Sequence, residues 1–245
     1  MAEPFLDHPR AFVEDVARVL GGWEVEHPKV NGFVSSTYDR FLNQLFATAD
    51  VSPREAAEAL GGRPGFVWLA ERSRSEETGS ESSATVVASV AFGMTAVTTG
   101  FAGAPRRAAA VDTVTSPADV DAWHDVYREV FGSDARGRAE WRALHAALGP
   151  AGNDSLVLLL ARVDGVAAAT GGVYFAHGWA GLYWFTTREP MRGRGLASAL
   201  VRAAHETARS RGIDRALLHA TAMGRPVYAN AGYEERRAFP MLLCR

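Results

Sequence analysis

The stretch Met191-Arg192-Gly193-Arg194-Gly195-Leu196-Ala197 joins an apolar run to an amphipathic helix. Upstream, residues 179–187 are rich in β-forming side chains. Downstream, apolar residues recur at helical spacing through 196–204, and Gly212 stands where a C-cap is expected. A glycine turn that opens a helix presents N–H groups without intrahelical partners at the positive end of the helix dipole. The sequence therefore predicts a strand, an anion-binding turn and a helix in one unit.

The turn is not specific by itself, because a tight turn without any ligand also favours glycine. Two common nucleotide motifs do not fit. A dinucleotide-binding turn requires a glycine where this chain has Ser198, and a P-loop requires a lysine, whereas the only lysine is Lys29. A nucleotide-binding protein is therefore disfavoured.

A different motif does fit. Residues 192–197 resemble the [RQ]-x-x-G-x-[GA] signature of the GNAT acetyltransferases, the GCN5-related N-acetyltransferase family. Residues 214–233 are similar to that family's next strand, short helix and closing Y-x-x-x-G-[FY] segment, with Tyr228, Gly232 and Tyr233 at its three named positions. Two motifs in this order are more specific than either alone.

The resemblance covers about residues 109–245. It implies an α/β fold, a mixed α+β sheet with helices on both faces, in which two neighbouring parallel strands splay apart to admit the pantetheine arm of acetyl-CoA. We predict a GNAT domain over residues 105–245 and an additional α/β region over residues 1–104. A degenerate half-copy of the same fold, without a phosphate loop, is one interpretation of that region.

The N-terminal elements are predicted from periodicity and turn signals. Helices are expected over residues 10–20, 37–49 and from a capping box at Ser52-Pro53-Arg54-Glu55 to Gly61-Gly62. Strands are expected over residues 23–35, with a turn at Asn31-Gly32, and 66–70, while residues 84–101 fit a helix or a strand. The polar residues 72–83 predict a mobile loop, and residues 103–107 a linker.

The C-terminal elements are easier to assign. The expected order is β-α-α-β-β-β-α-β-α-β, with a hairpin turn at Asp164-Gly165 and another at His177-Gly178. The ranges are 109–114, 117–131, 138–148, 156–163, 166–176, 179–187, the helix after the glycine turn, 214–220, a short helix near Tyr228, and 233–243.

The resemblance also assigns the contacts of acetyl-CoA, the acetyl-donor co-substrate. Pantetheine would pair with the backbone of Phe185, Thr186 and Thr187 as an added strand. Asn230 is either a coenzyme contact or a capping or solvated residue. The pyrophosphate would be held by the amides of a loop whose two arginines either add charge or are solvated: Arg192, Gly193, Arg194, Gly195, Leu196 and Ala197.

Acyl transfer requires a polarised thioester carbonyl, a deprotonated amine and a stabilised or protonated thiolate. Tyr228 is the candidate general acid, because a phenol of pKa about 10 can deliver a proton to a thiolate whose thiol has a pKa of about 8.5. The alternative is an aromatic ring that only packs under the short helix.

The general base is not evident from the sequence. His219 is expected beside the splay, where a hydrogen-bonded structural histidine is the alternative. Glu189 reads as a surface turn residue. His124, Asp125 and Glu129 share the first helix of the matching region, and His124 is expected to face solvent. Water can also relay the proton. The histidines show no ligand spacing, so we expect no metal.

Composition bounds the function further. The chain has 245 residues, 47% hydrophobic, with a net charge of −2, which gives no general attraction to nucleic acid or membrane surfaces. One cysteine, Cys244, excludes an internal disulfide. We find no signal peptide and no run long enough for a bilayer span, so the expected location is cytoplasmic.

The prediction is an acetyl-CoA-dependent N-acetyltransferase that moves the acetyl group directly to a primary amine of a small molecule or peptide. The alternative is a non-catalytic acyl-CoA sensor or partner-binding module of the same fold. The acceptor and the acyl length stay open. The N-terminal region offers a lid over the acceptor pocket, the surface of a homodimer, or both.

Overall fold

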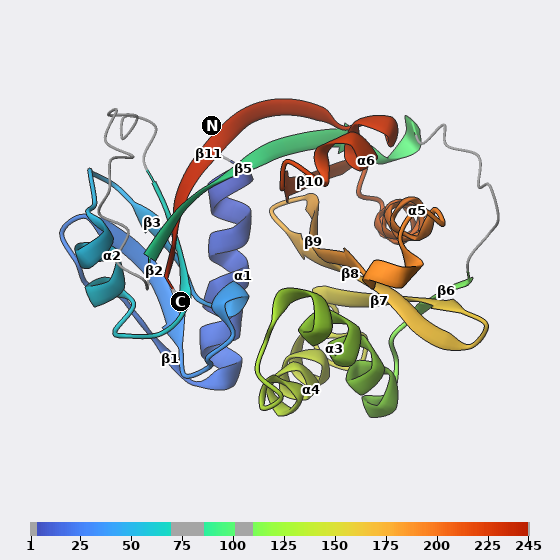
Figure 1. Ribbon diagram of the computed structural model, residues 1–245, viewed down its shortest axis with the longest axis horizontal. Helices are drawn as coiled ribbons and strands as arrows, with labels where there is room; N and C mark the ends of the chain where they lie inside the picture. The colour runs from blue at the N-terminus through green and yellow to red at the C-terminus, as the bar shows by residue number, and fades with distance from the viewer. Residues whose placement is uncertain (1–3, 70–85, 101–109, 245) are drawn as a thin grey trace. The chain divides into compact units, whose positions relative to one another are not determined.

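The computed structural model describes residues 4–69, 86–100 and 110–244 (Figure 1). The chain packs as two units, the first formed by residues 1–91 with 237–245 and the second by residues 92–236. The predicted loop over 72–83 and the predicted linker over 103–107 lie outside the described residues. Within the described part, no helix combines the length and apolarity of a membrane span.

The N-terminal unit is a mixed sheet with a helix on each face. Its strand order is β1-β2-β3-β4-β11, in which β3 and β4 are parallel and the other pairs antiparallel. The elements are α1 (Pro4–Leu20), β1 (Gly22–Glu24), β2 (Val30–Ser35), η1 (Arg40–Leu42), β3 (Gln44–Ala47), α2 (Pro53–Ala59), β4 (Gly65–Trp68) and the end of β11 (Glu234–Cys244).

The two helices of this unit flank β2 and β3 in Figure 1. The buried side chains of α1, among them Phe12 and Val16, face one side of the sheet. On the other side, Leu60 at the end of α2 belongs to an apolar cluster with Leu45 and Val67. The predicted capping box is confirmed at Ser52, which starts α2.

The helix predicted over residues 37–49 is wrong. A short 3₁₀ turn is followed by the strand β3, in which Leu45 packs on the α2 side and Phe46 lies under the guanidinium of Arg10 from α1. A strand buried on both faces gives a continuous apolar run, which short-range periodicity does not distinguish from a helix. The side chain of Asn43 fixes the extended backbone by accepting from the Ser35 N–H (2.8 Å).

The turn predicted at Asn31-Gly32 is also wrong. Both residues lie inside β2, and the chain reverses three residues earlier, between the bridged residues His27 and Val30. The preceding Pro28-Lys29 pair forms the turn.

The C-terminal unit repeats the same plan. Its strand order is β5-β10-β9-β8-β7-β6, with β9 and β10 parallel and the other described pairs antiparallel. The elements are β5 (Val86–Val97, of which 92–97 lie here), η2 (Thr98–Gly100), β6 (Ala110–Thr113), α3 (Pro117–Phe131), α4 (Gly137–Leu148), β7 (Leu156–Val163), β8 (Val166–Ala176), β9 (Trp179–Thr187), η3 (Glu189–Met191), α5 (Leu196–Ser210), β10 (Arg215–Ala220) and α6 (Arg225–Asn230).

This arrangement confirms the predicted order of elements and the mixed sheet with helices on both faces. In Figure 1, α3 and α4 lie on one side of β7, β8 and β9, and α5 lies on the other. The hairpin turn has positive φ at both Asp164 (51°) and Gly165 (81°), as the aspartate–glycine pair predicts. Residues 84–101, which were ambiguous, contain the strand β5.

The two units have matching topologies. The sequence β1-β2-β3-α2-β4 corresponds to β7-β8-β9-α5-β10, and in both units the helix connects the two parallel strands. Each sheet ends on an antiparallel strand from the other half of the sequence: β11 beside β4, and β5 beside β10. This match supports the interpretation of the N-terminal region as a half-copy of the same fold.

Candidate functional site

The parallel strands β9 and β10 separate near the middle of β9. Their pairing ends at Leu182 and Leu218, and no described residue of β10 pairs with β9 from Tyr183 onward. Beyond that point, β10 pairs only with β5, through His219 and Ala220. The edge of β9 that faced β10 is therefore left without a strand partner, as the resemblance implied.

A β-bulge turns β9 where the separation begins. Trp184 and Phe185 together oppose Gly171 of β8, and Trp184 has a φ of 56°, which is rare for a bulky residue. The Thr170 hydroxyl donates to the Trp184 carbonyl oxygen (3.2 Å) in the buried interior. The bulge therefore belongs to the packed core of the unit and redirects the strand.

Two glycines of β8 make room for this bulge. A Cβ at Gly171 would lie 2.9 Å from the Phe185 ring, and one at Gly172 would lie 2.5 Å from the Trp184 ring. Neither Trp184 nor these glycines was among the predicted site residues. The signal was present, because a glycine pair inside an apolar strand pattern indicates a bulge or a close approach.

The glycine turn follows β9 and opens α5. Gly193 (φ 75°) and Gly195 (φ 78°) are both left-handed, and Gly195 is an N-cap without any side-chain cap. The first backbone bond of the helix runs from the Ala199 N–H to the Gly195 oxygen (3.0 Å). No hydrogen bond within the described part of the chain uses the N–H groups of residues 193–198. An added Cβ at either glycine would meet no atom within 4 Å, so the turn borders open space.

The turn combines three properties that suit an anion: free N–H groups, the positive end of a 15-residue helix, and nearby positive charge. Both Arg192 and Arg194 are exposed, and Leu196 is buried beneath the helix start. Arg192 also ties the turn to the strand, because its Nε lies 3.4 Å from the Thr187 carbonyl oxygen. The end of β9 and the glycine turn are thereby joined.

Tyr228 lies on α6, the short helix that follows β10. Its half-buried ring meets the Phe185 ring edge-on, with centroids 6.4 Å apart. Burial of the ring raises the pKa of the phenol above its usual range. The phenol therefore keeps its proton at neutral pH. The structure brings Tyr228 and Phe185 together, and the exposed Asn230 ends the same helix.

The candidate bases differ in their surroundings. His219 is half-buried and lies one position beyond the last β9–β10 pair, which places it at the separation of the strands. Glu189 is exposed in η3, as expected of a turn residue. Asp125 forms an ion pair with Arg138 of α4.

The expectation that His124 faces solvent is wrong. Its side chain is fully buried, because α4 packs over this part of α3. The start of α4 approaches so closely that a Cβ at Gly137 would lie 2.9 Å from His124 Nε2. On the same helix, Glu129 forms an ion pair with Arg188 (3.0 Å), the residue after β9, and so anchors the end of that strand.

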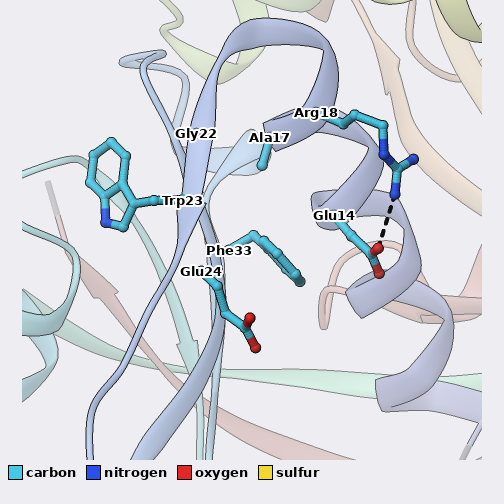
Figure 2. A pocket seen from close by; sticks show the side chains of 7 residues that line it. All are labelled: Glu14, Ala17, Arg18, Gly22, Trp23, Glu24 and Phe33. Carbon is cyan, nitrogen blue, oxygen red and sulfur yellow. Dashed lines mark hydrogen bonds and ion pairs between the residues drawn. The ribbon is translucent and has the colours of Figure 1, made fainter.

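The N-terminal unit holds a separate shallow hollow, shown in Figure 2. It has a volume of about 210 Å³ and lies between α1 and the β1–β2 strands, lined in part by Trp23, Glu24 and Phe33. Glu14 and Arg18 form an ion pair at its side (2.9 Å). None of the predicted site residues lines it. Among the described residues, no group of three or more His, Cys, Asp or Glu could hold a metal ion.

Comparison with known proteins agrees with this geometry. Residues 120–233 match the model of the acetyltransferase (GNAT) family, so this part of the chain is a GNAT domain. The match covers β9, the glycine turn, α5 and α6, which carry the predicted site residues. No curated protein matches the sequence of the chain.

Solved structures share the fold over nearly the whole chain. They include three GCN5-related N-acetyltransferases or proteins like them: one from Kribbella flavida (18% identity, 97% of this chain and 94% of that one, TM-score 0.64), one from Streptococcus suis (14%, 96% and 99%, 0.62) and one from Sphaerobacter thermophilus (17%, 94% and 84%, 0.55). At this identity the likeness shows the fold, and it extends to the N-terminal unit.

The domain and the fold together define the class. Residues 120–233 form an acetyltransferase domain of the GNAT type, the class of enzymes that transfer acetyl groups. Acetyltransferases of this family use acetyl-CoA as the donor.

Proposed function

We propose that the chain transfers the acetyl group of acetyl-CoA directly to a primary amine of a small molecule or a peptide. The observation that carries this proposal is one continuous surface. The unpaired edge of β9 leads from Phe185 to Thr187, and the turn joined to Thr187 ends in open N–H groups. Acetyl-CoA has pantetheine amides for the strand edge and a pyrophosphate for the turn.

The phosphate end is supported by the chemistry of the turn. The amides of Gly193 through Ala197 offer neutral donors that need no side chain, while the exposed Arg192 and Arg194 supply positive charge. Since the turn borders open space, a pyrophosphate can approach the backbone closely.

Tyr228 is the proposed general acid. The amine nitrogen attacks the thioester carbonyl carbon, the carbon–sulfur bond breaks, and the phenol donates its proton to the departing thiolate. The proton of the amine leaves to solvent, and solvent then reprotonates the phenolate. The phenol of Tyr228 carries its proton before the reaction begins, as a general acid must.

The first test is a calorimetric titration of acetyl-CoA into the full chain, followed by measurement of free thiol released with a panel of primary amines, from small diamines to peptide N-termini. We expect binding and amine-dependent thiol release. Binding of acetyl-CoA without thiol release in the presence of any tested amine would favour the acyl-CoA sensor. Absence of binding by the folded protein would refute the acetyl-CoA site.

A further inference from the structure

We propose that His205, in the buried face of α5, is a positioning residue for the general acid: it fixes the ring of Tyr233, which in turn orients Tyr228. This inference rests on the proposed role of Tyr228. Neither motif of the sequence includes His205, and no part of the reaction as described above uses it.

His205 is unusual in its surroundings. It is fully buried, and its neighbours on the buried face of α5 are all apolar, among them Val201, Ala204 and Ala208. A polar group in such a cluster is costly unless it is hydrogen-bonded. His205 Nε2 lies 2.8 Å from the Tyr233 hydroxyl, so this bond gives both of these atoms a partner inside the core. An aliphatic side chain would pack there without this requirement, which indicates a specific role.

The pair stays neutral at physiological pH. Burial, with a smaller contribution from the charge of Arg209, lowers the pKa of His205 to about 4, and burial raises the pKa of Tyr233 well above its usual range. A neutral imidazole and a neutral phenol share one hydrogen bond in either tautomer. The bond therefore persists across the pH range in which the enzyme would work.

Tyr233 reaches Tyr228 in two ways. Its N–H donates to the Tyr228 carbonyl oxygen (3.0 Å), which closes the turn after α6. Its ring meets the Tyr228 ring edge-on, with centroids 5.8 Å apart at 69°. The Tyr228 ring thus contacts two aromatic rings edge-on, that of Tyr233 and that of Phe185 in β9.

Through this packing, the hydrogen bond between His205 and Tyr233 can affect the orientation of the Tyr228 hydroxyl. The direction of the Tyr228 hydroxyl depends on two side-chain torsions, and the packing of its ring restricts both. If the Tyr233 ring loses its hydrogen bond to His205, it can shift, and the Tyr228 ring packed against it can then shift as well. Proton delivery is sensitive to displacements of the order of an ångström, whereas coenzyme binding at the turn is not affected.

The test uses variants of the full chain. His205→Leu and Tyr233→Phe each remove the hydrogen bond, while His205→Gln retains an amide that can donate or accept. We expect kcat to fall about tenfold in the first two variants, with acetyl-CoA affinity unchanged within about twofold, and to recover mostly in His205→Gln. In a Tyr228→Phe background, His205→Leu should have no further effect on kcat.

An equal loss of kcat in both backgrounds, or no loss in either, would overturn the proposal. A second readout does not require activity. The chain has six tyrosines, so ¹³C-tyrosine spectra are tractable, and Tyr228→Phe identifies the Tyr228 signal. We expect faster flipping of the Tyr228 ring in Tyr233→Phe and His205→Leu than in wild type and His205→Gln. An unchanged flip rate would refute the positioning role, even where no acceptor amine is found and the proposed function fails.

Discussion

The two units share a strand order, but the helices that connect their parallel strands begin in opposite ways. In the N-terminal unit, the hydroxyl of Ser52 accepts from the Glu55 N–H, and the Glu55 carboxylate accepts from the Ser52 N–H (2.9 Å). The start of α2 is closed by its own side chains. In the C-terminal unit, α5 starts at Gly195 with no side-chain cap, and its N–H groups stay available.

The strands that precede these helices, β3 and β9, differ in their length and in how far they pair with the next parallel strand. β3 has four residues, and it pairs with β4 in regular register from Gln44 to Phe46. β9 has nine residues, and five of them lie beyond its last pair with β10, after a bulge at Trp184. One topology therefore serves two purposes. A capped helix and a short strand give a packed unit, while an open helix and a separated strand leave groups for a ligand.

The largest expected effect comes from closing the open helix. Gly195→Glu places a carboxylate in the anion site and forces a left-handed backbone on a non-glycine residue. We expect acetyl-CoA binding to fall by at least about a hundredfold in calorimetry, which corresponds to about 2.7 kcal/mol.

The matched control for that variant is Gly212→Ala. Gly212 also has positive φ (71°) and open space around it, but it lies at the other end of α5. It should lower stability by about 1 kcal/mol and leave acetyl-CoA affinity unchanged. A similar loss of binding in both variants would show that backbone strain, not the anion site, explains the result.

The next effect tests the acid. Tyr228→Phe removes one hydroxyl and keeps the ring that contacts Phe185 and Tyr233, so the fold is expected to be unchanged. With an accepted amine, kcat should fall about a hundredfold while KM for acetyl-CoA stays within about twofold. Tyr38→Phe, in the N-terminal unit, serves as the control and should retain full activity. A Tyr228→Phe variant as active as wild type would reduce the residue to a packing role.

A smaller effect tests the closed helix. Ser52→Ala removes the N-cap of α2, and we expect a loss of about 1 kcal/mol in the free energy of unfolding by urea denaturation. Acetyl-CoA affinity should not change. Ser198→Ala, at the third position of the uncapped α5, should cost much less stability. Equal losses would contradict the distinction between a closed and an open helix start.

The smallest expected effect is the loss of stability when Glu55 is protonated. Hydrogen bonds from Lys29 Nζ (2.7 Å) and from the backbone and hydroxyl of Ser52 lower its pKa to about 2. Because the folded pKa is depressed, the stabilisation is present above the unfolded value near 4.5 and is lost as pH falls toward 2. Carboxyl NMR should show this, and Lys29→Gln should raise the pKa. A pKa of Glu55 near 4.5 in wild type would contradict the closed cap.

The parts of the fold that local chemistry specifies were predictable. The Asp164-Gly165 turn, the capping box at Ser52 and the amphipathic face of α5 each have a mechanism within a few residues of sequence. The prediction failed where burial on two faces removed the periodicity, as at Leu45 and Phe46 in β3. It also failed at His124, because the spacing on α3 does not reveal that α4 packs over it.

The sequence by itself determined the glycine turn, the helix that follows it and the family resemblance, because these depend on backbone conformations that only certain residues allow. The tertiary structure decided where the strands separate, that Trp184 turns β9 at that point, and that Tyr228 meets Phe185 there. It also paired His205 with Tyr233 across 28 positions of sequence. Contacts of this kind arise from packing between distant elements, and local propensity does not encode them.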